Sequence, residues 1–85
     1  MFSIDFSSSA ERFLKKIDKM TAKRIIERIE KLGADPFPKD VKRVVNSEEK
    51  VFRIRVGDYR IQYLVIYSDN KIFITDIDKR ERAYD

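Results

Sequence analysis

The residues with the clearest potential for chemistry are cationic side chains in the C-terminal half of the chain. They are Arg53, Arg55, Arg60, Lys79, Arg80 and Arg82. Guanidinium groups stay charged at every physiological pH and bind phosphate oxygens, often through two parallel hydrogen bonds. If the fold brings these residues together, they form a site for a polyanion.

The residue types that are missing restrict any reaction at such a site. The 85-residue chain contains no histidine and no cysteine, which excludes imidazole bases, thiol nucleophiles and the usual zinc sites. We expect neither a metal ion nor another cofactor. Tyr84, close behind the basic run, is a candidate proton acceptor, because nearby positive charge lowers the pKa of a phenol from its usual value of about 10.

A tight turn determines how the arginine-bearing segments meet. Residues 51–56 alternate between apolar and basic side chains, as a half-buried strand does. Gly57-Asp58 then forms a two-residue loop, in which glycine can adopt a positive φ. This loop places Arg55 opposite Arg60, on the face of the hairpin that turns away from the apolar residues.

Two positions further from the turn, Arg53 lies opposite Gln62 on the same face. Like charges that oppose each other in a sheet cost a few tenths to about 1 kcal/mol, and a bound polyanion would remove that cost. A simpler interpretation is that these are ordinary surface arginines with acidic partners. The candidate partners are Asp58, Asp76, Asp78 and Glu81. The sequence leaves both interpretations open.

A second turn, Ser68-Asp69-Asn70, places residues 71–78 antiparallel to residues 67–60. The chain then leaves the sheet beside Arg60, so the basic run approaches the arginines of the hairpin. On the apolar face of the sheet, we expect Tyr63 and Tyr67 to pack into the core.

The N-terminal half predicts one strand and two helices. Residues 2–6 alternate like a short strand, and a serine cap precedes a helical pattern over about residues 8–19. Thr21 is predicted to cap a second helix that ends at Gly33. Asp35-Pro36-Phe37-Pro38 breaks the helical pattern, and the chain then changes to strands.

These elements give one α+β domain, residues 1–85, in the order β-α-α-β-β-β. A helical hairpin packs on a twisted, mainly antiparallel sheet. The net charge is +4. Lys23-Glu27-Lys31 has i,i+4 spacing, which predicts a solvated salt-bridge face rather than an RNA surface. No apolar run approaches a membrane span and no signal peptide is evident, so we expect a soluble cytoplasmic protein.

Two segments resemble RelE-type toxins of the RelE/ParE toxin-antitoxin superfamily. The first is Phe52–Tyr63, with its basic strand, glycine turn and Tyr-Arg pair. The second is Asp78–Tyr84, which contains Lys-Arg-Glu-Arg. The similarity extends over essentially the whole chain and implies a RelE-like microbial ribonuclease fold.

The resemblance implies a ribosome-dependent endoribonuclease. Such a toxin cuts mRNA in the ribosomal A site by 2′-hydroxyl attack, inhibits translation, and is held in a hetero-oligomer by a RelB-like antitoxin. The matching catalytic positions are Arg60, Arg80 and Tyr84, and the matching RNA-binding positions are Arg53, Arg55, Lys79 and Arg82. Two departures are that arginines stand at 53 and 55, where well-studied members have lysines, and that the C-terminal ending is short.

Three other functions fit the same sequence. A ParE-like protein would poison DNA gyrase without nuclease chemistry. A noncatalytic module could bind RNA or the ribosome through the same basic residues. A degenerate toxin could retain antitoxin binding alone.

Overall fold

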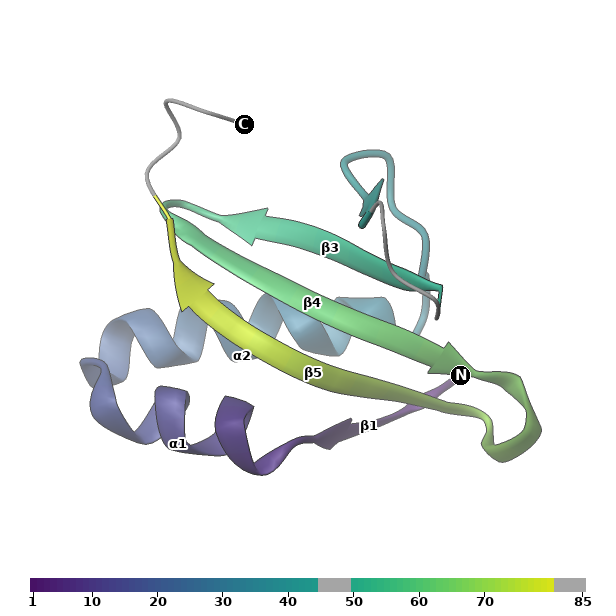
Figure 1. Ribbon diagram of the computed structural model, residues 1–85, viewed down its shortest axis with the longest axis horizontal. Helices are drawn as coiled ribbons and strands as arrows, with labels where there is room; N and C mark the ends of the chain where they lie inside the picture. Colours follow the sequence, from purple (N-terminus) through teal and green to yellow (C-terminus); the bar gives the residue numbers. More distant parts are fainter. Residues whose placement is uncertain (45–49, 81–85) are drawn as a thin grey trace.

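The computed structural model describes residues 1–44 and 50–80, which form two helices against one five-stranded sheet (Figure 1). In chain order the elements are β1 (Ser3–Phe6), α1 (Ser8–Lys16), α2 (Lys19–Leu32), β2 (Lys42–Arg43), β3 (Val51–Val56), β4 (Tyr59–Ile66), the 3-10 helix η1 (Tyr67–Asp69) and β5 (Lys71–Lys79). The sheet order is β1-β5-β4-β3-β2. Only the β1–β5 pair among these is parallel, which confirms the predicted α+β class.

The two helices begin at residues whose side chains cap them. Ser7 accepts a hydrogen bond from the Ala10 backbone N–H at 3.1 Å, as predicted for the serine run. The second cap is Asp18, whose carboxylate accepts from the Thr21 N–H at 3.0 Å. Hydrogen bonding to Thr21 lowers the pKa of this carboxyl group.

Two predicted helix boundaries were therefore wrong. The first helix ends at Lys16 rather than near residue 19, and Thr21 lies inside the second helix instead of capping it. Asp18 takes the capping role because an aspartate oxygen reaches the free N–H groups of the first turn at least as well as a threonine does.

Gly33 ends α2, as predicted, but close packing is the reason for a glycine there. Its φ is −59°, an ordinary right-handed value. A Cβ atom at this position would lie 2.9 Å from the backbone oxygen of Phe2, and the Phe2 N–H donates to the Gly33 carbonyl at 2.8 Å. The end of α2 is thus joined directly to the chain before β1.

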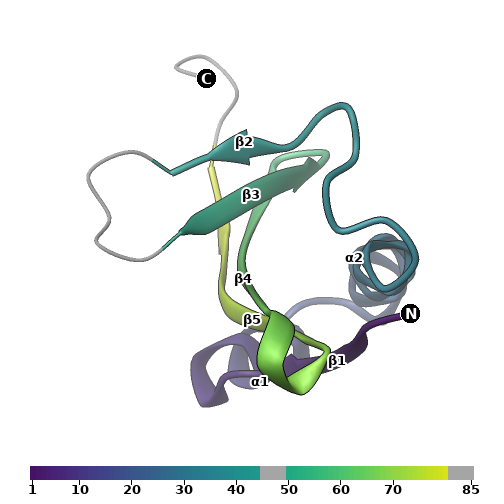
Figure 2. The same cartoon turned by 90° about the vertical axis from the view of Figure 1, so that its right-hand side faces the viewer.

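The core lies between the helices and one face of the sheet. Its buried side chains are Ala10, Ile25, Ile29, Leu32, Ile54, Ile61, Tyr63, Ile72, Ile74 and Ile77. Both helices lie on the same side of the sheet (Figures 1 and 2). The other face is the one that carries the predicted site.

The β3–β4 hairpin has the predicted register. Val56 pairs with Tyr59, and Arg55 pairs with Arg60. Gly57 has φ of +58°, the first-position geometry that a two-residue hairpin takes with glycine. The positions of the arginines on the sheet therefore follow directly from this turn.

The predicted register of the β4–β5 pair is correct at one end of the strands and wrong by one residue at the other. Arg60 pairs with Asp78, as predicted, but Tyr63 pairs with Ile74 across an irregularity that leaves Thr75 as the extra residue. The chain between the strands forms η1, in which Tyr67 is 68% exposed. The prediction that Tyr67 packs into the core was wrong, because the strand ends at Ile66.

Tyr63 is fully buried, as predicted, and its hydroxyl donates to the Pro36 carbonyl at 2.6 Å. Burial raises the pKa of this phenol above its usual range, so the hydroxyl remains a donor. This bond holds the proline segment against the sheet, on the side where α2 ends.

Replacing Tyr63 by phenylalanine is expected to lower the free energy of unfolding by about 1–2 kcal/mol, because the partly buried Pro36 carbonyl loses its donor. Urea unfolding followed by circular dichroism measures this change. Tyr67→Phe removes the same hydroxyl from an exposed ring and is expected to change stability by less than about 0.5 kcal/mol. Equal stabilities of the two variants would contradict the proposed tether.

Candidate phosphate-binding site

The face of the sheet opposite the helices carries the arginines of the hairpin. Successive strand residues point to opposite faces, so the burial of Ile54 and Ile61 on the helix side puts Arg53, Arg55 and Arg60 on the other side. All three arginines are partly exposed. The shared face predicted from the hairpin turn is confirmed.

Arg60 is held by a carboxylate on the neighbouring strand. Its Nε donates to Oδ1 of Asp78 at 3.3 Å, and its Nη2 donates to Oδ2 at 3.0 Å. The Arg60 side chain is 16% exposed and that of Asp78 is 32% exposed. This two-pronged pair fixes the guanidinium plane in a partly desolvated position.

Arg80 joins the same carboxylate from the end of β5. Its Nε lies 3.5 Å from Oδ2 of Asp78, and its side chain is 62% exposed. Two guanidinium groups thus converge on one carboxylate oxygen, and the three side chains keep a net positive charge. We call Arg60, Asp78 and Arg80 the arginine–carboxylate cluster.

Backbone contacts bring Arg80 to the hairpin. Its N–H donates to the Asp58 carbonyl at 2.7 Å, and its own carbonyl accepts a hydrogen bond from Nη1 of Arg55 at 3.3 Å. These two bonds join the exit of β5 to both sides of the Gly57-Asp58 turn. The approach of the basic run to the hairpin arginines is therefore confirmed as far as residue 80.

The remaining predicted site residues are placed differently or lie outside the described residues. Lys79 pairs with Tyr59, so strand alternation directs it to the face opposite Arg60. Arg82 and Tyr84 belong to the range 81–85, which lies outside the described residues. The structure brings Arg53, Arg55, Arg60 and Arg80 to one region of the sheet.

Asp78 is the residue whose importance the sequence reasoning missed. It was one of four candidate partners, and the predicted register already placed it opposite Arg60. An acidic residue that directly opposes a strand arginine forms a favourable cross-strand pair, and this signal favoured the Arg60–Asp78 pair but not the sharing of its carboxylate with Arg80. Asp78 lies between the guanidinium groups of Arg60 and Arg80.

No helix in the described part of the chain is long and apolar enough to span a membrane. Within residues 1–44 and 50–80, no group of acidic side chains is arranged to hold a metal ion.

The described residues thus form a small α+β domain in which Arg60 and Arg80 both lie within 3.5 Å of Oδ2 of Asp78. A family model described as the ParE toxin of the type II toxin-antitoxin system parDE matches residues 4–84. The RelE1 protein of Methanocaldococcus jannaschii is 37% identical over 86 residues, covering 98% of this chain and 94% of that protein. The chain belongs to the RelE/ParE superfamily and is a toxin of a type II toxin-antitoxin system.

Solved structures agree with this assignment. RelE in the archaeal RelE–RelB complex of Pyrococcus horikoshii OT3 is 27% identical, with a TM-score of 0.81, covering 96% of this chain and 98% of that one. The isolated Escherichia coli RelE toxin has the same TM-score, 0.81, at 17% identity, covering 99% of this chain and 89% of that one. The predicted RelE-like fold is confirmed.

Proposed function

We propose that this toxin is a ribosome-dependent endoribonuclease that cleaves mRNA in the ribosomal A site and so inhibits translation. The observation that carries the proposal is the convergence of Arg60 and Arg80 on one carboxylate oxygen, beside Arg55, on the uncovered face of the sheet. A phosphodiester that displaces this carboxylate meets two guanidinium groups at ion-pairing distance.

The proposed reaction is an internal transfer at one phosphate. The ribose 2′-oxygen loses its proton and forms a bond to phosphorus, while the bond from phosphorus to the 5′-oxygen breaks and that oxygen gains a proton. The products are a 2′,3′-cyclic phosphate and a free 5′-hydroxyl. Arg60 and Arg80 stabilise the extra negative charge of the phosphorane, the contribution that is usually largest in such sites.

The remaining predicted residues receive supporting roles. In the proposal Tyr84 accepts the 2′-hydroxyl proton. The mRNA backbone is held by Arg53, Arg55 and Arg82, and Lys79 is left out of this set because it lies on the opposite face of the sheet. Full cleavage by a Tyr84→Phe variant would remove the tyrosine from the mechanism.

Ribosome dependence follows from the weakness of acid–base catalysis at this site. Arginine is a poor proton acceptor because its pKa exceeds about 12. Catalysis then depends on holding the 2′-oxygen in line with the phosphate, and well-oriented reacting groups gain orders of magnitude in rate. In the proposal the ribosomal decoding site imposes this geometry on the mRNA.

The decisive experiment maps mRNA ends in a cell-free translation reaction that contains the purified protein. We expect codon-spaced cuts with 2′,3′-cyclic phosphate ends in translated mRNA and negligible cutting of the same RNA without ribosomes. Efficient cleavage of free RNA would overturn the dependence on ribosomes. Intact mRNA together with arrested translation would favour a noncatalytic ribosome-binding protein.

A ParE-like gyrase poison is the second candidate, because the matching family model is described as a ParE toxin. It predicts intact mRNA and accumulation of cleaved DNA in a gyrase supercoiling reaction. The two reactions can be run on the same protein preparation. The cluster on the sheet favours the nuclease, since its two converging guanidinium groups suit a phosphate that gains charge.

We also propose a RelB-like antitoxin as the partner. The similar protein of Pyrococcus horikoshii was crystallised as a RelE–RelB complex, and the E. coli RelBE structure is likewise a toxin–antitoxin complex. A degenerate toxin would bind this partner yet leave mRNA intact. Because its proposed target is the translating ribosome, we expect this toxin to act in the cytoplasm.

Asp78→Asn is expected to increase the affinity for single-stranded RNA by about 3- to 10-fold, because it removes the anion that competes for the two arginines and leaves their shape intact. Fluorescence anisotropy with a labelled RNA oligonucleotide measures this affinity. Asp76→Asn, which lies opposite Gln62, removes the same charge without freeing an arginine and serves as the control. Weaker binding by Asp78→Asn would show that the carboxylate orients the arginines instead of competing for them.

A further inference from the structure

A second cationic surface lies away from the open face of the sheet, in a groove between α2 and the outer side of the β3–β4 hairpin. Arg24, Arg28 and Lys31 line it from the helix, and Arg55 and Gly57 line it from the hairpin. We call this the α2 groove. Its volume is about 290 Å³, enough for a segment of an extended chain but not for a folded domain.

The three helix cations form one stripe. Their spacing, i, i+4 and i+7, puts them on one face of α2 over roughly 10 Å of helix axis. Arg28 is paired with Asp40 at 2.7 Å. Arg24 and Lys31 are exposed, and neither makes an ion pair with another described residue. Glu27 is the acidic residue among those that line the groove, so the cations outnumber it.

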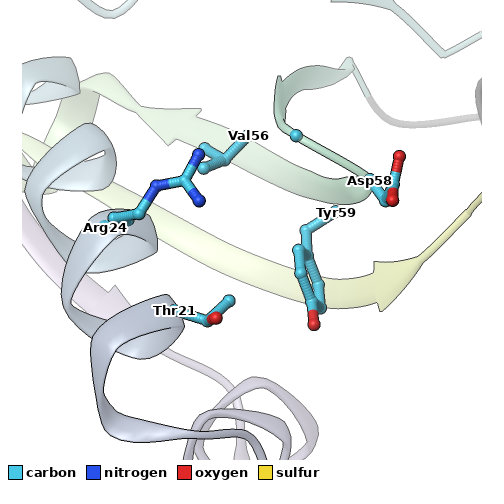
Figure 3. A pocket seen from close by; sticks show the side chains of 6 residues that line it. Thr21, Arg24, Val56, Asp58 and Tyr59 are labelled. Atoms are coloured by element: carbon cyan, nitrogen blue, oxygen red, sulfur yellow. The ribbon is translucent and has the colours of Figure 1, made fainter.

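Arg24 is directed at the hairpin. Figure 3 shows its guanidinium group extending from the helix toward Val56, while the side chain of Asp58 points away. A Cβ atom at Gly57 would lie 3.9 Å from Nη2 of Arg24. The guanidinium group therefore lies close to the glycine of the turn.

A neighbouring pocket extends the groove past the turn. It shares Arg24, Val56 and Gly57 with the α2 groove and adds Asp58 and two residues with hydroxyl groups, Thr21 and Tyr59. Figure 3 shows both hydroxyl-bearing side chains at this pocket. Hydroxyl groups and arginines together are the side chains that commonly contact phosphate and sugar oxygens.

The lining favours a nucleic acid over a protein. Protein interfaces are anchored by large buried apolar or aromatic side chains, whereas the apolar lining of the α2 groove consists of Val56 and Gly57. A phosphate backbone requires only cations at intervals along its path. Arg24 and Lys31, which make no ion pair within residues 1–44 and 50–80, meet that requirement.

We propose that the α2 groove binds a second stretch of RNA backbone, distinct from the phosphate at the arginine–carboxylate cluster. This inference rests on the proposed function, because it assigns further RNA contacts to the same toxin. The two surfaces are continuous, since Arg55 lines the groove and also donates to the carbonyl of Arg80. The groove contributes affinity and orientation and takes no part in the chemistry.

The test compares two double variants that remove equal charge. Arg24→Gln/Lys31→Gln neutralises the two groove cations that make no ion pair with another described residue. Arg12→Gln/Lys23→Gln neutralises one arginine and one lysine at exposed helix positions outside the groove. Both sets are exposed, so both variants should fold with unchanged thermal midpoints. The probe is a labelled, noncleavable 2′-O-methyl single-stranded RNA, titrated across a series of salt concentrations.

We expect the groove variant to lose about 5- to 20-fold in RNA affinity and about 1 to 1.5 in the slope of log K against log salt. The control variant should lose less than about 2-fold. Equal losses would overturn the inference, because they would indicate a general effect of charge. Unchanged RNA binding with weaker binding of an acidic antitoxin would also overturn it and assign the groove to the protein partner.

The outcome is separable from that of the proposed nuclease. Groove-dependent RNA binding by a wild-type protein that leaves translated mRNA intact would support the groove and contradict the nuclease. Normal mRNA cleavage by the wild-type protein, with unchanged RNA affinity in the groove variant, would support the nuclease and contradict the groove.

Discussion

Replacing Arg80 by alanine is expected to reduce ribosome-dependent mRNA cleavage by about 10²- to 10³-fold, the loss that follows removal of one donor to a developing oxyanion. Arg80 is the more accessible guanidinium of the cluster, with 62% of its side chain exposed, and it shares Oδ2 of Asp78 with Arg60. Its removal leaves one guanidinium group to stabilise the phosphorane. Primer extension on translated mRNA measures the loss.

We expect the Arg80→Ala variant to stay folded, so the loss of cleavage does not come from unfolding. The backbone N–H of residue 80 still donates to the Asp58 carbonyl, because the substitution changes only the side chain. Arg12→Ala, at an exposed position of α1, is the matched control and should cleave at the wild-type rate. Unchanged cleavage by Arg80→Ala would eliminate the proposed site.

Replacing Ile61 by alanine is expected to lower the free energy of unfolding by about 3 kcal/mol, since the side chain is fully buried and the change leaves a cavity. A domain of this length has roughly 4–13 kcal/mol in total, so the loss is a large part of its stability. The thermal midpoint should fall by roughly 15 °C. Differential scanning calorimetry measures both quantities.

Ile26→Ala makes the same substitution on α2, where the side chain is 36% exposed. We expect it to cost less than about 1 kcal/mol, because less apolar area is lost and alanine favours the helix. A comparable drop in both variants would mean that burial against the sheet is not what stabilises this domain. Ile61 also lies between Arg60 and Gln62, so its burial keeps the polar side chains turned to the open face.

The arrangement of the arginines could be predicted because one short turn determines it. A two-residue loop at Gly57-Asp58 allows a single register, and the observed pairs agree with it. The helix boundaries were less predictable, since Asp18 and Thr21 are both good N-caps. Only the folded structure shows that Asp18 caps α2. Exposure of Tyr67 was not predictable from alternation, because η1 ends the strand before that residue.

The contact of Asp78 with both arginines could not be predicted from the sequence. Its register opposite Arg60 was available, but several acidic residues competed for the arginines on sequence grounds. Only the distances identify a carboxylate shared by Arg60 and Arg80. The α2 groove was harder still, since helical spacing alone makes Arg24 and Lys31 look like ordinary solvated charges.

The extra residue at Thr75 has a wider effect than bending one strand. Because side chains alternate with period two, a one-residue insertion exchanges the two faces for everything that follows it. If the register of the Tyr63–Ile74 pair continued without the extra residue, Ile77 would point away from the core, Asp76 and Asp78 would face the helices, and Lys79 would lie on the arginine side. The bulge therefore determines which charged side chains of β5 lie on this face. One additional residue places two carboxylates, rather than a lysine, on the proposed RNA-binding surface.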